Sequence, residues 1–542
     1  MPAQADERDA PPWWRVPLVA TAVAVPLYAL WAVWLATGGG DLAAQLAWAG
    51  FMERHPATAY NFSWYGGTHT ANYSLLAPPL MAVLGVRTVS VLAGLVGTWV
   101  LACLFVRTGV RWPLPPAVVG ALTLWCNIAS GRTTFALGVA IGLPALLYVR
   151  RTGIAVVCAA LAATASPVAG LFLVVAGAAW LLDRQWRKGL ALILPPFVVV
   201  GVVTLLFPFR GEQPMATEKL WMPLAVSAAV ALAAPREWRV VRCGAGVYGL
   251  GVVLTYLIAS PIGTNVERLL GLAAAPVLLA ALLTRFGEGP GTGSGPAAWA
   301  GEFGRGLVRP ARAVLAVALF FSTYWLIDKT EDDLVVSTDV PSWAAHTDGV
   351  VRELERLGAD RTRVEVVPAR NHREATALAP HINMARGWNR QLDVERGRLF
   401  YDGSLNPATY RQWLDRWAVG YVVLPHGRPD GPAEDEAALV RGAPSWLEQV
   451  WQDEGWTVYR VRDAVPLVSS PATVVGGDDA SLTVRMPAAG SVTVRVAYSP
   501  WLRASGACLR QEGEWTRLTV PRAGEYRLDS PYRVPRSAGS DC

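Results

Sequence analysis

Long apolar stretches between residues 16 and 327 restrict the possible folds of this chain more than any other feature. The first stretch, Val16–Thr37, has 22 residues, so as a helix it would be about 33 Å long and could cross a bilayer. No A-x-A-like cleavage site precedes Gly38, which favours an anchor over a cleaved signal peptide. Only 17% of the residues are charged, against roughly 25% in soluble domains. The sequence therefore predicts a polytopic α-helical membrane protein.

The apolar stretches predict about eleven membrane-spanning helices, because an exposed span needs ~20 apolar residues and a buried one fewer. Residues 73–86 are also apolar, but Pro78 and Pro79 interrupt them. We expect them to form a re-entrant or surface-lying segment. The predicted spans cover residues 16–37, 88–106, 113–130, 134–149, 153–165, 167–182, 189–209, 220–234, 243–260, 266–284 and 311–327.

The distribution of Arg and Lys orients these spans. With a cytoplasmic N-terminus, the inside segments hold sixteen cations and the short outside loops hold six, which satisfies the positive-inside rule. This topology predicts a multi-pass plasma-membrane protein with a transmembrane domain at 1–327, an outside loop at 38–87 and everything from 328 onward outside. The Gly- and Pro-rich stretch 286–310 is then a flexible cytoplasmic linker. We read the net charge of +6 as a topology signal, and no nucleic-acid partner is expected.

The predicted outer tail has two parts. Residues 328–465 read as an α/β domain, in which Asn406 caps a helix that runs into a strand ending in "YVVLP". Residues 466–542 alternate apolar and polar side chains, as in "SLTVRMPAAGSVTVRVAYSP", and predict a β-sandwich-like domain. Cys508 and Cys542 lie in this tail and could pair only outside the cell; whether they do is left open. No Cys/His cluster suggests a metal site.

The predicted outside loops carry few charged residues, and these are the candidate functional groups. Charged groups at membrane depth are costly and usually face a cavity, so we expect these loops to converge on one cleft. Asp41 follows three glycines directly after the first span, in a loop that is also rich in aromatic residues. The candidates from all these loops are Asp41, Trp64, Tyr65, His69, Arg132, Lys219, Glu267 and Arg268.

A first span followed at once by an outside Asp and a long loop with surface helices resembles the GT-C superfamily. These are integral membrane glycosyltransferases that use lipid-phosphate-linked sugars. The resemblance covers residues 1–327 as architecture and rests on "GGGDLAAQ", "WYGGTHTANYSLLAPP" and "SPIGTNVERL". The tail, with "GRLFYDGSLNPATYRQWLDRWAVGYVVLP", is similar to outer domains of uncharacterised actinobacterial membrane proteins of this class. Many members have two adjacent acidic residues in the first loop, whereas Asp41 stands between Gly40 and Leu42.

The resemblance implies transfer of a sugar from a polyprenyl-phosphate donor to an envelope glycan or lipid acceptor on the outer face. Asp41 would be the catalytic base for the acceptor hydroxyl. Arg268, then Arg132 and Lys219, would bind the donor phosphate. Glu267 would orient an arginine, and His69, with Trp64 and Tyr65, would contact the substrate. The sequence requires no cofactor, and a role for a divalent cation is left open.

Simpler interpretations exist for the same residues. Asp41 could cap a surface helix, Arg268 could extend to lipid headgroups, and the His69 segment could be a turn packed at the interface. For the whole chain, a multi-span transporter or flippase and a non-catalytic scaffold for envelope assembly are the alternatives. Transporters often contain inverted repeats, and the sequence shows no internal repeat.

Overall fold

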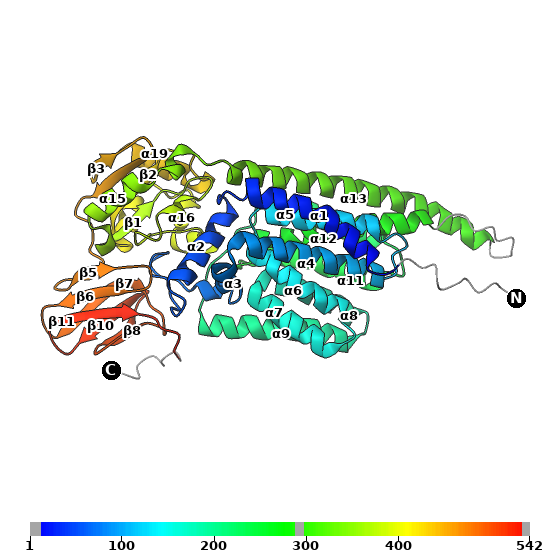
Figure 1. Cartoon of the computed structure of the whole chain (residues 1–542), viewed down its shortest axis with the longest axis horizontal. Coiled ribbons are helices and arrows are strands. Elements are labelled where there is room, and N and C mark those ends of the chain that lie inside the picture. Colours follow the sequence, from blue (N-terminus) through cyan, green and yellow to red (C-terminus); the bar gives the residue numbers. More distant parts are fainter. Residues whose placement is uncertain (1–11, 288–297, 534–542) are drawn as a thin grey trace. The chain divides into compact units, whose positions relative to one another are not determined.

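The computed structural model describes residues 12–287 and 298–533 (Figure 1). The chain divides into two compact units, each made of separate stretches of sequence. Unit 1 consists of residues 1–35, 87–201 and 214–333, and unit 2 consists of residues 36–86, 202–213 and 334–542.

Unit 1 is helical, and its helices coincide with the apolar stretches of the sequence. Six of the described helical segments are long and apolar enough to cross a membrane: Arg15–Leu35, Val86–Arg107, Trp186–Leu206, Arg239–Leu257, Gly263–Phe286 and Arg309–Thr338. Helices α5 to α8 are shorter and also apolar, so the chain is a multi-pass membrane protein by length and composition. The helices are α1 (Arg15–Leu30), α4 (Val86–Arg107), α5 (Leu114–Ala129), α6 (Thr133–Leu147), α7 (Thr152–Ala165), α8 (Pro167–Leu182), α9 (Trp186–Leu206), α10 (Trp221–Ala233), α11 (Arg239–Leu257), α12 (Glu267–Gly287) and α13 (Ala298–Thr338).

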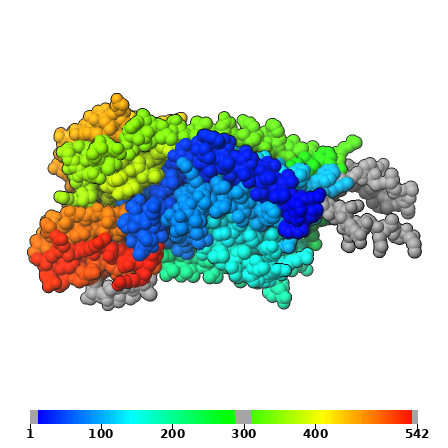
Figure 2. Space-filling view, viewed as in Figure 1, coloured from blue at the N-terminus to red at the C-terminus, as the bar shows by residue number. Residues whose placement is uncertain are grey.

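Small residues allow the helices of unit 1 to pack closely. A Cβ on Gly138 of α6 would lie 2.7 Å from the Cβ of Ala169 on α8, a contact typical of membrane helices. The break between α7 and α8 has a local cause, because Ser166 caps α8 and Pro167 occupies its first turn. Val33 and Trp34, just after α1, are exposed apolar side chains. Figure 2 shows α1 in deep blue at the surface of the molecule.

Two helices of the first loop, α2 (Asp41–Arg54) and α3 (Ala77–Leu84), belong to unit 2. The interrupted apolar segment 73–86 thus contains a short helix, with Pro78 and Pro79 in its first turn. Of the predicted linker 286–310, residues 288–297 lie outside the described residues, and the remaining residues belong to α12 and α13.

The α/β part of unit 2 is built on a four-stranded sheet with the order β1-β2-β4-β3. β1 (Arg363–Val366) and β2 (Val419–Pro425) are parallel, whereas β4 (Trp456–Val461) is antiparallel to both β2 and β3 (Leu447–Gln452). Asn406 forms a capping box at the start of α18, as the sequence predicts. The helices are α14 (Ser342–Ala345), α15 (Asp348–Arg356), α16 (Glu374–Ala377), α17 (Arg390–Arg396), α18 (Pro407–Arg416) and α19 (Glu434–Arg441).

Two further sheets form the C-terminal part of unit 2. One has the order β7-β10-β9 and the other the order β5-β6-β11-β8. Val484, Val494, Leu518 and Leu528 come from both sheets and share one core. The consecutive strands β6 and β7 pair in different sheets, although a glycine turn follows β6. The strands are β5 (Thr473–Gly477), β6 (Leu482–Met486), β7 (Gly490–Ala497), β8 (Arg503–Ala504), β9 (Cys508–Glu512), β10 (Trp515–Val520) and β11 (Gly524–Asp529).

Candidate functional site

Five charged residues of unit 1 form one group, which we call the charge cluster: Arg132, Lys219, Glu267, Lys329 and Asp333. Arg132 directly precedes α6, and its Nη2 donates to Oδ2 of Asp333 at 2.9 Å. Glu267 begins α12 and is only 5% exposed. Its Oε2 lies 3.8 Å from Nζ of Lys329 on α13, and Lys219 and Arg132 also interact with it electrostatically. A buried carboxylate is thus surrounded by cations.

The charge cluster favours binding of an anion. It contains three cations and two carboxylates, a surplus of one positive charge. Arg132, Lys219 and Glu267 precede or begin α6, α10 and α12 respectively. The N-terminus of a helix carries a partial positive charge and free backbone N–H groups. The surplus positive charge of the side chains and the partial positive charge of the helix N-termini therefore both favour an anion.

Arg268, the predicted first phosphate ligand, lies beside the charge cluster's α6 and contacts an aromatic ring. Its guanidinium lies over the ring of Phe135, 5.5 Å from the centroid. Phe135 is in the first turn of α6, three residues after Arg132. The aromatic ring orients Arg268 next to the start of α6, while Lys329 makes the contact with Glu267.

Asp41 belongs to unit 2, where it is the first residue of α2. The N-cap position is Gly40, at φ +64, so Asp41 lies in the first turn and is not the capping residue itself. The N–H of Gly40 donates to the carbonyl of Asn371 at 2.8 Å. A Cβ on Gly39 would lie 2.7 Å from the carbonyl oxygen of Ser337. The glycines before Asp41 therefore permit a close backbone approach that a side chain would block.

Arg373 holds this approach together. Its guanidinium donates to the carbonyl oxygens of Thr37, Ser337 and Asp339 at 2.6, 2.8 and 2.9 Å. It also donates to the hydroxyl of Thr37. We call this set of bonds the Arg373 clamp. It joins the end of the first hydrophobic segment, the end of α13 and the loop after β1, and so fixes the backbone from which Asp41 projects.

His69, Trp64 and Tyr65 are core residues of unit 2, with 4%, 2% and 0% exposure. The ring nitrogens of His69 lie 2.7 Å from the carbonyl oxygen of Ala59 and 2.9 Å from Oγ of Ser499. Burial lowers the pKa of His69 to about 4. These side chains offer no open face to a ligand in the structure, and their predicted contacts with a substrate stay a prediction.

The predicted site residues are thus divided between the two units. Arg132, Lys219, Glu267 and Arg268 are in unit 1, and Asp41 with the three buried aromatic residues is in unit 2. Sequence reasoning missed Lys329, Asp333 and Arg373. The first two stand in "DKTEDD", directly after the predicted last span. The signal available for them was their spacing of four residues, which places two charged side chains on one face if the last helix continues past residue 327.

Comparison with known protein families finds a match for one segment of this chain. Residues 469–542 match a family model described as a domain of unknown function, DUF8823. The match covers the two sheets that contain β5 to β11. No glycosyltransferase family is identified, and no curated protein matches the chain.

Proposed function

We propose that this chain is a membrane glycosyltransferase that takes a sugar from a lipid-phosphate-linked donor and transfers it to a cell-envelope acceptor. The charge cluster of unit 1 is the observation that carries the proposal. A lipid phosphate needs cations to neutralise its charge, and the cluster supplies Arg132, Lys219 and Lys329 around Glu267. Arginine and lysine are the usual phosphate ligands of proteins.

In this proposal the carboxylates of the cluster position its cations. Asp333 fixes Arg132 by a hydrogen bond, and Glu267 holds Lys329. Positioned cations stabilise the charge that develops on the departing phosphate more effectively than mobile ones. Arg268 adds a further guanidinium beside α6.

Asp41 is the proposed base that accepts the proton of the acceptor hydroxyl. The Arg373 clamp supports this role because it bonds the carbonyl of Thr37, and the N–H of Gly40 bonds the carbonyl of Asn371, so the backbone just before Asp41 is held at two points. A base must lie within hydrogen-bonding reach of its proton, and a fixed backbone limits the positions that its side chain can take.

One observation supports an outer location for the transfer, and a second supports the prediction that the loops of the cluster share one side of the membrane. Cys508 is disulfide-bonded, and disulfides persist in oxidising compartments; Cys542 lies outside the described residues. In addition, Arg132, Lys219 and Glu267 come from three loops predicted to lie on the outer side, and they meet in one cluster. Loops on opposite sides of a membrane could not do so.

The test compares envelope glycans, by mass spectrometry, from cells with and without the chain. We expect loss of one sugar linkage, restored by the wild-type chain and by Arg239→Met, and not by Asp41→Asn or Lys329→Met. Arg239 is a suitable control because it is also an ion-paired cation of unit 1, with Asp183 at 3.4 Å, on a helix outside the cluster. Unchanged glycans in cells without the chain would contradict the proposal.

A lipid flippase is the second candidate, because the same cluster could hold the phosphate of a lipid in transit. Reconstitution in sealed vesicles separates the two functions. A flippase would move a labelled polyprenyl-phosphate sugar between leaflets without forming a glycosidic bond, whereas the transferase would consume the donor only when an acceptor is present.

A further inference from the structure

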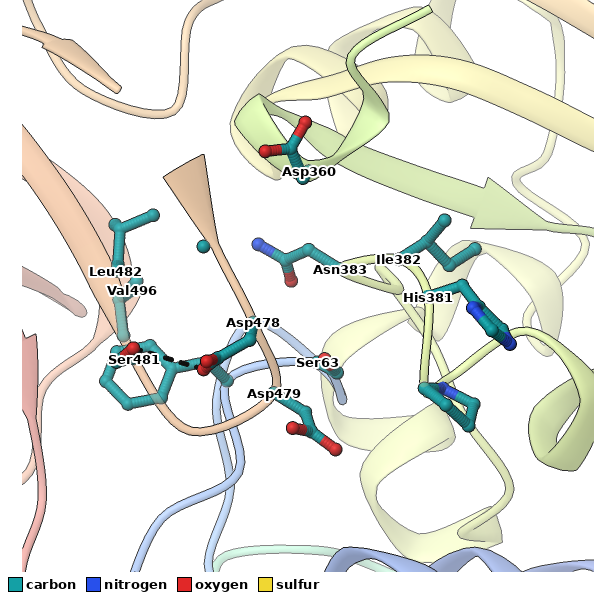
Figure 3. A pocket seen from close by; sticks show the side chains of 13 residues that line it. Ser63, Asp360, His381, Ile382, Asn383, Asp478, Asp479, Ser481, Leu482 and Val496 are labelled. Atoms are coloured by element: carbon teal, nitrogen blue, oxygen red, sulfur yellow. Dashed lines mark hydrogen bonds between the residues drawn. The ribbon is translucent and has the colours of Figure 1, made fainter. Parts of the chain in front are cut away.

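The pocket drawn in Figure 3 lies between the first loop, the α/β part and the two C-terminal sheets of unit 2. Its volume of about 60 Å³ has room for a few water molecules. Oδ1 of Asn383 is shielded from solvent, and Phe62 and Leu482 are only 2% and 3% exposed. These groups offer no surface to a larger ligand. A ligand of unit 2 must meet accessible side chains, such as those that follow β1 and β2.

Two arginines face each other beyond the carboxyl ends of the parallel strands β1 and β2. The loops after these strands pair as a short antiparallel ladder. The N–H of Arg370 donates to the carbonyl of Arg428 at 2.8 Å, and the N–H of Asp430 donates to the carbonyl of Pro368 at 2.9 Å. Arg370 and Arg428 are therefore directly opposite each other, and their Cβ atoms should lie about 5 Å apart on the same face.

Both side chains have N–H groups that are free to bind a ligand. The side chain of Arg370 is 48% exposed, and the one ion pair that it forms with the described residues is a long one, with Nη1 at 3.7 Å from Oδ1 of Asp430. Arg428 is exposed, and its side chain forms no hydrogen bond or ion pair with any described residue. Like charges directly opposite each other on paired strands are destabilising. An anion that contacts both guanidinium groups would remove this repulsion.

A third arginine is held in place beside this pair. Nη2 of Arg390 donates to Oδ2 of Asp430 at 2.6 Å, and its Nη1 donates to the hydroxyl of Tyr401 at 2.8 Å. The guanidinium also lies over the ring of Trp388, 5.0 Å from the centroid. The side chain of Arg390 is 23% exposed, so part of it still faces solvent. Asp430 thus fixes Arg390 and leaves the opposed pair largely uncompensated.

Nearby carboxylates do not cancel the positive charge at this edge of the sheet. Three arginines are set against Asp430, a surplus of two positive charges. The buried carboxylate of Glu374 lies 3.4 Å from Nδ1 of His372. Glu434 and Asp435 are exposed in the first turn of α19 and form no ion pair with the described residues. Ligands of α/β domains commonly bind beyond the carboxyl ends of parallel strands, and the surplus at this edge favours an anion.

We propose that Arg370, Arg390 and Arg428 form a binding site for a phosphate group, which we call the arginine site. Arginine presents a planar fork of donors that matches phosphate oxygens. Three guanidinium groups and two surplus charges suit a phosphate better than a carboxylate, which has one charge and two oxygens. The phosphate is that of an anionic lipid headgroup or of a soluble phosphate-bearing molecule. This inference does not depend on the proposed transferase activity, whose phosphate ligands belong to unit 1.

The test measures hydrogen exchange of residues 367–373 and 426–430 in the full chain in detergent micelles. Inorganic phosphate is titrated at constant ionic strength, and it should slow exchange in both loops. Arg370→Met and Arg428→Met should each raise the phosphate concentration needed for half of the protection by about tenfold or more, as expected for loss of a charge-assisted bond. Arg352→Met is the matched control, because Arg352 is an exposed arginine on α15, and it should leave that concentration unchanged.

A second measurement identifies the source of the phosphate. The chain is placed in nanodiscs of phosphatidylcholine with or without phosphatidylglycerol. If phosphatidylglycerol slows exchange in the same two loops and Arg428→Met abolishes the effect, the arginine site binds a lipid headgroup. If inorganic phosphate protects the loops and phosphatidylglycerol does not, it binds a soluble molecule. Absence of protection by both probes in the wild type would overturn the proposal.

Thermal unfolding without phosphate separates ligand binding from a structural role. Arg428→Met removes one of two opposed like charges and breaks no side-chain bond among the described residues. It should therefore unfold at the same temperature as the wild type or higher. A normally folded Arg428→Met variant that phosphate protects as well as the wild type would overturn the proposal. Equal protection of the wild type by chloride at the same ionic strength would do so too.

Discussion

Arg132 and Asp333 are 201 residues apart in the sequence and are joined by a 2.9 Å hydrogen bond. Asp333 lies one helical turn after Lys329 on α13, and Lys329 faces Glu267. The last hydrophobic helix therefore supplies two of the five members of the charge cluster. Phosphate binding in unit 1 should depend on α13 as much as on the loops.

Replacing Lys329 with methionine should weaken binding of polyprenyl phosphate by about tenfold or more, since a bond to a charged group contributes roughly 1.5–3 kcal/mol. The variant also leaves Glu267 without its nearest cation. Titration of the lipid into the purified chain in nanodiscs measures the effect. Arg239→Met should bind the lipid like wild type. If Lys329→Met also binds it with wild-type affinity, Lys329 does not contact the phosphate.

Replacing Asp41 with asparagine should reduce sugar transfer by roughly 100-fold or more, the usual contribution of a general base. Asparagine keeps the size of the side chain, so the unfolding temperature should change little. Glu53→Gln is the matched control, because Glu53 is an exposed carboxylate on the same helix. Transfer rates should be measured with membranes that supply the natural donor and acceptor. Full activity of Asp41→Asn would exclude it as the base.

The sequence predicted the helices well and their charged ends poorly. Apolar runs are a local signal, and residues 114–129 or 167–182 became helices almost as expected. α13 continues to Thr338, beyond the predicted end at 327. Lys329 and Asp333 lie after the end of the apolar run but within the helix, because each forms an ion pair, with Glu267 and Arg132 respectively.

Charge was the only sequence signal for which the structure brings candidate residues together. Arg132, Lys219 and Glu267 stood out as rare charges in predicted outside loops, and they do interact. The prediction for His69 did not include its burial against Ser499, which is 430 residues away in the sequence. Side-chain exposure depends on such distant partners, which no local pattern in one sequence reveals.

Replacing Arg373 with methionine should lower the free energy of unfolding by about 2–4 kcal/mol, because three backbone carbonyls lose a charged donor. Thermal unfolding in detergent measures the change. Thr376→Val removes a single bond, to the carbonyl of Ala43 at 3.0 Å, and should cost only about 1 kcal/mol. Similar losses for both variants would show that the Arg373 clamp contributes little.

Stability should fall with acidification because of His69. Burial lowers its pKa from 6.5 to about 4, so between these values the unfolded chain binds more protons than the folded one. The stability conferred by a neutral His69 is therefore complete above about pH 6.5 and falls by roughly 3 kcal/mol as the pH decreases to about 4. His69→Gln should flatten this part of the curve. A parallel pH profile for the variant would assign the acid sensitivity to other groups.

Cysteine labelling tests the proposed orientation. Ser404→Cys, in an exposed turn of unit 2, should react with a membrane-impermeant maleimide in intact cells. Arg187→Cys, near the start of α9 on the predicted cytoplasmic side, should react only after lysis. The unsubstituted chain provides the background from its free thiols, Cys103, Cys126, Cys158 and Cys243. The reverse pattern would place unit 2 in the cytoplasm.

The division of unit 2 into three stretches has a consequence for synthesis on the ribosome. The hydroxyl of Tyr65 contacts the carbonyl of Gly387, 322 residues later. At about 5–20 residues per second, roughly 16–64 s pass between the emergence of these two residues. During that interval the aromatic first loop has left the ribosome without the core that will bury it. A chain truncated before Gly387 would leave these aromatic side chains without that core.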